Sequence, residues 1–184
     1  MKKITFNSPV ILSFALISGI VLIANYMTAG WLNSMFFSVY KGSFKDPLFY
    51  LRLLTHVLGH SNWEHYYGNM ILLLLVGPIL EEKYGSMQIL SVIVAGALIT
   101  GVVHILLPGN SALLGASGVV FSFILLASVT GSGKGIPATL IIACLLYISK
   151  ELYAGIAVRD NISQLTHIIG GSIGAVYGLA IRKN

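Results

Sequence analysis

Four polar side chains lie within otherwise apolar stretches of this chain, namely His65, Asn69, Ser117 and His167. Serine and histidine together attack acyl groups, because the imidazole takes the hydroxyl proton and so activates a weak nucleophile. An amide and a second imidazole can donate hydrogen bonds to the oxyanion that this attack creates. These residue types therefore predict hydrolysis of an acyl or peptide bond by a nucleophilic serine.

The spacing of these residues suits helices. His65 and Asn69 are four residues apart, so they project from one face of a helix, one turn apart. Ser117 lies in the stretch "GASG" (115–118), where Gly115 and Gly118 allow the backbone to bend and a neighbouring helix to come close.

His167 heads a stripe of small residues in the last apolar stretch. Gly170 and Gly174 follow it on the same helical face, and small residues at this spacing let membrane helices pack closely. We therefore expect this helix to press against the one that carries Ser117, with His167 at the top of the contact. Phe121, one turn after Ser117, is expected to pack against the imidazole and to orient it.

A metal site is the competing interpretation of the histidines. His56, His60 and His65 could together suggest zinc. The stretch "HSNWEH" (60–65) is also close to the inverted zinc-protease motif H-x-x-E-H, but one residue too many separates His60 from Glu64. The serine interpretation is favoured, and with it we expect neither a metal nor another cofactor.

Composition places the chain in a membrane. Of its 184 residues 56% are hydrophobic and 9% are charged, whereas soluble domains carry about 25% charged residues. The net charge of +5 is scattered along the sequence and does not form the dense basic cluster of a nucleic-acid binder. The lipid bilayer is therefore the first expected partner, and nucleic acid is not expected.

Six apolar stretches approach the length that a spanning helix needs, roughly 17–25 residues. They cover residues 9–28, 63–80, 87–107, 112–130, 136–155 and 162–181, and the fifth is strongly apolar only as far as Ser149. The sequence therefore predicts an all-α polytopic membrane protein, with residues 1–184 forming one domain of six transmembrane helices. The loop from Gly30 to Asn62 is long and rich in aromatic residues, so we expect it to fold against the membrane surface.

The alternation of span directions gives the polar residues a common depth. The second, fourth and sixth spans enter from one face, and their polar residues lie within about two turns of that entrance, roughly 3–10 Å deep. Six spans also place both termini on one side, where basic residues stand at helix ends, so we expect cytoplasmic termini. Lys2 and Lys3 before an apolar stretch are also compatible with a signal peptide. A retained helix is favoured, because a small-residue cleavage site is missing and five more stretches follow.

The ordered set of motifs resembles the rhomboid intramembrane serine proteases of the bacterial six-helix type. The set extends from about Arg52 to Gly178. No single motif in it is specific to the family, but the motifs together, in this order, are a strong match. The pattern is His56-x3-His60-x4-His65-x3-Asn69, then Glu81 and "YGS" (84–86), then "GASG" (115–118), then His167-x2-Gly170-x3-Gly174.

The resemblance implies a six-helix bundle with a water-filled cavity that opens to the outer face. It implies Ser117 as nucleophile and His167 as base in a dyad without a carboxylate, and an oxyanion site of His65, Asn69 and the Ser117 N–H. The substrates would be single-span membrane proteins, cleaved through an acyl-enzyme near the outer face of a bacterial cytoplasmic membrane.

Two departures from the family pattern and several alternatives accompany this resemblance. Leu51 stands before Arg52 where many members have tryptophan, and Phe121 stands where many have tyrosine. A rhomboid specialised for a C-terminal sorting tag is one alternative, and a catalytically silent rhomboid-like protein that binds membrane clients is another. Silent members typically lack the serine or the histidine, and this chain has both. A transporter is disfavoured because the two halves of the chain show no internal repeat.

Overall fold

The computed structural model describes residues 6–129 together with scattered single positions between 138 and 180. The predicted spans 136–155 and 162–181 are described only at those scattered positions, and His167, Gly170 and Gly174 lie outside the described residues. Apart from one isolated bridge, the regular structure of the described part is helical, so the all-α prediction is confirmed there. The helices are α1 (Pro9–Met27), α2 (Trp31–Phe36), α3 (Pro47–Thr55), the 3-10 turn η1 (His56–Leu58), α4 (Trp63–Tyr84), α5 (Ser86–Leu106) and α6 (Ser117–Val129).

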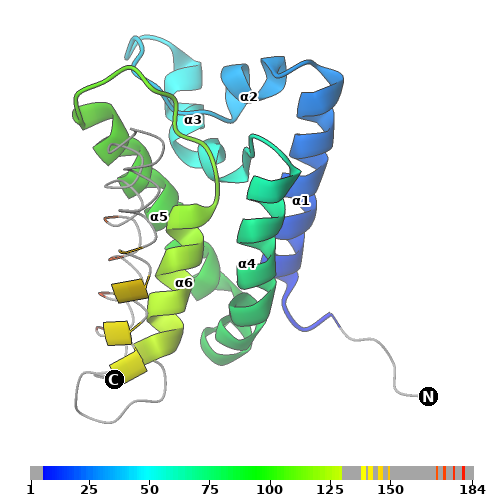
Figure 1. The fold of residues 1–184 in the computed structure, drawn as a ribbon, viewed down its shortest axis with the longest axis vertical. Helices are drawn as coiled ribbons and strands as arrows, with labels where there is room; N and C mark the ends of the chain where they lie inside the picture. Colours follow the sequence, from blue (N-terminus) through cyan, green and yellow to red (C-terminus); the bar gives the residue numbers. More distant parts are fainter. Residues whose placement is uncertain are drawn as a thin grey trace.

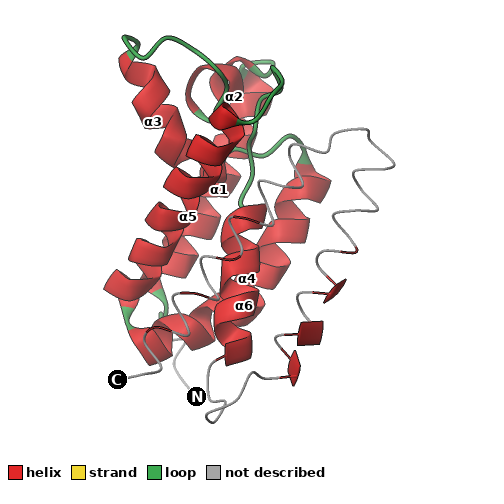
Figure 2. Cartoon of the chain, turned by 90° about the vertical axis from the view of Figure 1, so that its left-hand side faces the viewer, coloured by secondary structure: helices red, strands yellow, loops and turns green. Residues whose placement is uncertain are grey.

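The long helices α1, α4, α5 and α6 pack side by side into a bundle, and α2 and α3 gather at one end of it (Figures 1 and 2). Two of the described helices, α1 and α5, are long and apolar enough to cross a membrane. Helix α4 has 22 residues but carries Glu64, Glu81 and two further charged residues at its ends. The predicted long first loop contains α2, α3 and η1, so it is a folded element and not an extended connection.

Helix α6 begins at Ser117, five residues later than the predicted start at Ala112. The apolar segment before it pairs instead with the first loop, because Val39 and Leu113 exchange two backbone hydrogen bonds of 2.9 Å. Gly115 then takes φ = 121°, a backbone conformation that favours glycine and ends the extended segment. In Figure 1 this segment crosses the end of the bundle and descends between the helices before α6 begins. Ser117 is thereby placed below that end.

At the opposite end of the bundle, the buried Glu81 joins α4 to the start of α1. Its two carboxylate oxygens accept hydrogen bonds from the N–H groups of Val10 at 2.9 Å and Ile11 at 3.0 Å. The hydroxyl of Ser86 donates a third, at 2.7 Å. A carboxylate is well suited to this place, because the first N–H groups of a helix lack intrahelical partners and carry partial positive charge.

We expect Glu81→Gln to lower the free energy of unfolding by about 1–3 kcal/mol, since it removes the charge and one acceptor from buried N–H donors. Glu82→Gln is the matched control, because Glu82 is exposed. The measurement is thermal unfolding of both variants in the same detergent. Equal melting temperatures for the two variants would contradict the capping role of Glu81.

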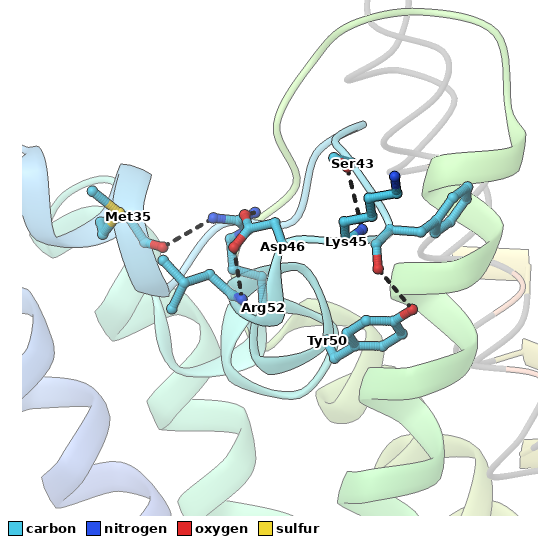
Figure 3. Close-up of polar contacts among 8 residues, drawn as sticks. Met35, Ser43, Lys45, Asp46, Tyr50 and Arg52 are labelled. Atoms are coloured by element: carbon cyan, nitrogen blue, oxygen red, sulfur yellow. Dashed lines mark hydrogen bonds and ion pairs between the residues drawn. The ribbon is translucent and has the colours of Figure 1, made fainter.

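The first loop is fastened by Arg52, which is buried in α3 (Figure 3). Its guanidinium forms a 2.7 Å ion pair with Asp46, donates to the carbonyl of Met35 at 3.3 Å and lies 4.5 Å from the centre of the Tyr40 ring. The N–H of Leu48 and this guanidinium both lower the pKa of Asp46. The neighbouring Leu51 is exposed, so the departure from tryptophan at that position leaves the Arg52 anchor in place.

Candidate active site

The structure brings His65 and Asn69 to the turn that precedes Ser117. The position that a Cβ atom would occupy on Gly115 lies 2.6 Å from Nε2 and Cε1 of His65 and 3.8 Å from Nδ2 of Asn69. Any side chain at Gly115 would therefore collide with the His65 ring. The hydroxyl of Ser61 is 3.2 Å from Nδ1 on the other side of that ring. His65 is thus held between the loop before α4 and the turn before α6.

Asn69 is oriented by His60, a buried residue of the loop before α4. Nδ1 of His60 is 3.2 Å from the carbonyl oxygen of Leu58, and Nε2 is 3.1 Å from Nδ2 of Asn69. A carbonyl can only accept and an amide nitrogen can only donate, so the proton of His60 must be on Nδ1. Nε2 then accepts one amide hydrogen of Asn69. The amide nitrogen of Asn69 carries a second hydrogen besides the one given to His60.

The surroundings of His60 keep it neutral. Burial lowers its pKa to about 4, and the nearby His65 acts in the same direction. The ring of His65 lies 5.0 Å and that of Tyr66 5.5 Å from the His60 ring, both edge-on. Protonation would place a hydrogen on Nε2, which would remove the acceptor for Asn69. The low pKa therefore preserves the hydrogen bond that orients Asn69.

This pKa predicts how stability depends on pH. Unfolded histidine has a pKa of about 6.5. Between pH 6.5 and about 4 the histidine is therefore protonated in the unfolded chain, whereas His60 in the folded protein stays neutral. The contribution of His60 is fully present above pH 6.5 and is lost as the pH falls towards 4, by roughly 3 kcal/mol in total. Between pH 7 and pH 4 the free energy of unfolding should fall less with decreasing pH in His60→Gln than in the wild type. Parallel curves would contradict a neutral His60.

His56, which the sequence analysis placed in the family pattern and in the alternative zinc cluster, has a structural role. Its buried Nε2 lies 3.1 Å from the carbonyl oxygen of Ala97 in α5. Its own backbone carbonyl accepts the N–H of Gly115 at 2.9 Å. One residue thus ties the first loop both to α5 and to the turn before Ser117. The sequence around His56 predicts these two contacts only weakly, because Ala97 and Gly115 are both distant from His56 in the chain.

Ser117 is the first residue of α6 and is partly exposed. Helical hydrogen bonding begins with the N–H of Val120, which donates to Ala116 at 2.9 Å. The N–H groups of a first helical turn point beyond the helix end, where they favour negative charge. Phe121 is buried one turn further on, and a Cβ on Gly118 would lie 3.0 Å from Thr100 of α5. The first turn of α6 is therefore fixed closely against α5.

An open cavity of about 310 Å³ lies beside this group, at the end of the bundle that holds the first loop. It is lined by residues of the first loop and of the segment before α6, among them Asn33, Ser61 and Leu114. The cavity comes closest to this group at Ser61, whose hydroxyl is the one that lies 3.2 Å from Nδ1 of His65.

The described residues contain no group of three or more His, Cys, Asp or Glu side chains that could hold a metal ion. His56 and His60, two members of the alternative zinc cluster, direct ring nitrogens at Ala97, Leu58 and Asn69. The polar neighbours of the three histidine rings include backbone carbonyls, the amide of Asn69 and the hydroxyl of Ser61. Such groups are typical of a hydrogen-bonded network, whereas zinc is usually held by Cys, His and carboxylate side chains.

Comparisons with known proteins agree on one family. The sequence profile of the rhomboid domain matches residues 48–184. The chain is 25% identical to the chloroplastic rhomboid-like protein 11 of Arabidopsis thaliana over 146 residues, which cover 71% of this chain and 51% of that protein. It is 27% identical to rhomboid-related protein 1 of Caenorhabditis elegans over 143 residues, 72% of this chain and 40% of that one. The chain thus spans about half or less of these relatives.

Proposed function

The chain belongs to the rhomboid family, and from that premise we propose that it is an intramembrane serine protease. The observation that carries this proposal is the contact of His65 and Asn69 with Gly115, two residues before Ser117 at the start of α6. Two side chains that can donate hydrogen bonds thereby lie close to the turn before Ser117, and Ser117 itself begins helix α6. This is the arrangement that an acyl-transfer oxyanion requires.

The proposed reaction uses His167 as the base. Oγ of Ser117 attacks the carbonyl carbon of the scissile bond while its proton passes to the His167 imidazole. His65, Asn69 and the Ser117 N–H stabilise the oxyanion, and its collapse breaks the C–N bond as His167 protonates the leaving amine. Water then hydrolyses the Ser117 ester, which releases the new carboxylate and restores the hydroxyl. We propose that Phe121 orients His167 by packing, in the absence of a carboxylate, and that Gly170 and Gly174 allow the last helix to approach α6. Gly118 instead faces Thr100 and allows the close packing of α6 on α5.

The proposed substrates are transmembrane segments of single-span proteins. A helical segment hides its carbonyls in hydrogen bonds, so the cleaved segment should contain small, helix-destabilising residues near the outer membrane boundary. The site lies at the end of the bundle where the first loop gathers, and we propose that this end faces outward. The protein would then be a multi-pass protein of the cytoplasmic membrane, with both termini in the cytoplasm. No cofactor takes part in this mechanism.

Labelling with a fluorophosphonate tests the proposal directly, because the probe bonds to an activated serine and expels fluoride. The purified wild-type protein in detergent should be labelled at Ser117, as located by peptide mass spectrometry. Ser117→Ala and heat-denatured wild type should not be labelled. Labelling that persists in Ser117→Ala, or folded wild type that resists the probe, would instead favour a silent, client-binding rhomboid-like protein.

A further inference from the structure

Asn33, a buried residue of the short helix α2, links the first loop to the group that orients Asn69. Its amide Nδ2 donates a 2.9 Å hydrogen bond to the backbone carbonyl of His60. Its own backbone N–H donates to Oδ1 of Asn25 in α1, also at 2.9 Å. Asn33 is 7% exposed and Asn25 is 8% exposed, so water competes little with either bond. A continuous polar path therefore runs from α1 through α2 to His60.

The backbone at His60 is also held by close packing. A Cβ on Gly59 would lie 2.3 Å from the carbonyl oxygen of Phe37, so the chain at Gly59 runs directly against the end of α2. The Asn33 bond fixes the next carbonyl along the chain, at His60. A buried carbonyl needs a donor, so loss of the Asn33 bond would free the backbone at His60 to shift, and the attached ring would shift with it. The direction of the His60 ring thus depends on Asn33.

We propose that Asn33 is a positioning residue for the reaction: it holds the His60 backbone so that the His60 ring keeps Asn69 aimed at the oxyanion. This inference rests on the proposed protease function and adds a residue of the first loop to it. No direct part in the reaction is proposed for Asn33 itself. Its effect reaches Asn69 through two hydrogen bonds, Asn33 to His60 and His60 to Asn69.

The kinetic test compares Asn33→Asp and Asn33→Ala with the wild type on a single-span reporter in proteoliposomes. Asn33→Asp keeps the size of the side chain but replaces the donor to His60 with an oxygen, and Asn33→Ala covers the case in which a buried carboxylate prevents folding. We expect kcat to fall about 10-fold with KM changed less than about twofold, because the oxyanion interaction exists only in the transition state. Rates are expressed per folded protein.

Ser34→Ala is the matched control. Ser34 is the next residue of α2 and lines the same cavity, but its hydroxyl donates to Trp31 and does not reach His60. Its kinetics should equal those of the wild type. Asn33 variants that match Ser34→Ala in kcat, or that lose only melting temperature while each folded molecule retains its wild-type rate, would overturn the inference.

A readout that needs no catalysis separates this inference from the proposed function. Nitrogen NMR of histidine-labelled protein, with His60→Gln to assign the signal, reports which ring nitrogen carries the proton. The wild type should show His60 protonated on Nδ1 alone, and the Asn33 variants should show a mixture of tautomers. If the wild type cleaves no reporter, the protease proposal fails, while an altered His60 signal would still support the positioning role. An unchanged His60 signal in both variants would overturn that role.

Discussion

Replacing Ser117 with alanine is expected to abolish cleavage of a single-span reporter, by at least about 10⁴-fold, while the protein stays folded. The reaction has no other nucleophile once the hydroxyl is gone, and removal of a catalytic serine typically costs this much or more. His167→Ala should have a comparable effect, because a serine hydroxyl without a base is a weak nucleophile. The measurement is reporter cleavage in proteoliposomes, with the cleavage site mapped by mass spectrometry.

Ser122→Ala is the matched control for this prediction. Ser122 lies in the same helix and is buried, and its hydroxyl donates to the carbonyl of Gly118 within α6. Its replacement should leave the rate unchanged. Cleavage by Ser117→Ala at the wild-type rate would show that Ser117 is not the nucleophile, and loss of cleavage in Ser122→Ala alone would place the reacting hydroxyl one turn deeper.

Gly115→Ala is expected to have the second largest effect, lowering both stability and activity. Its φ of 121° strains any residue with a Cβ, at a cost of about 1–3 kcal/mol. The new methyl group would also lie 2.6 Å from the His65 ring, so the ring or the turn must move. Because a displacement of about 1 Å at an active site can cost 10²-fold, we expect at least that loss in kcat. Thermal unfolding and reporter kinetics measure the two effects.

Gly30→Ala separates the backbone strain from the collision. Gly30 also has a positive φ, of 89°, but a Cβ there would meet no atom within 4 Å. This variant should lose stability by a similar amount and keep its rate per folded molecule. A folded Gly115→Ala that cleaves like Gly30→Ala would show that His65 does not need its present place against the turn.

The catalytic group could be proposed from the sequence because its signals are local. The four-residue spacing of His65 and Asn69 holds for any helix, and the alternation of spans places that pair and Ser117 at one end of the bundle. The contact of both side chains with Gly115 agrees with this reasoning. The approach of His167 to Ser117 stays a prediction, because His167 lies outside the described residues.

The start of α6 shows where the local signals stop. The segment from Ala112 to Ala116 is mostly small and apolar, so by composition it extends the helix that follows. Its hydrogen bonds go instead to Val39 and His56, which lie more than fifty residues earlier in the chain. Pairing of this kind depends on how the first loop folds, so it cannot be predicted from the pattern of residues 112–116.

The sequence by itself determined that this protein is a helical membrane protein of the rhomboid family. The length of its apolar stretches, its low charge content and the order of its motifs are properties of the chain alone. Only the tertiary structure decided how the site is supported. By sequence Arg52 is one of several charged residues in a long loop, and only its burial and its ion pair with the partly exposed Asp46 make it an anchor. His60 and Asn33 gained their roles from partners 9 and 27 residues away. Buried polar groups must find partners wherever the fold supplies them, so their roles are set by the fold and not by their neighbours in sequence.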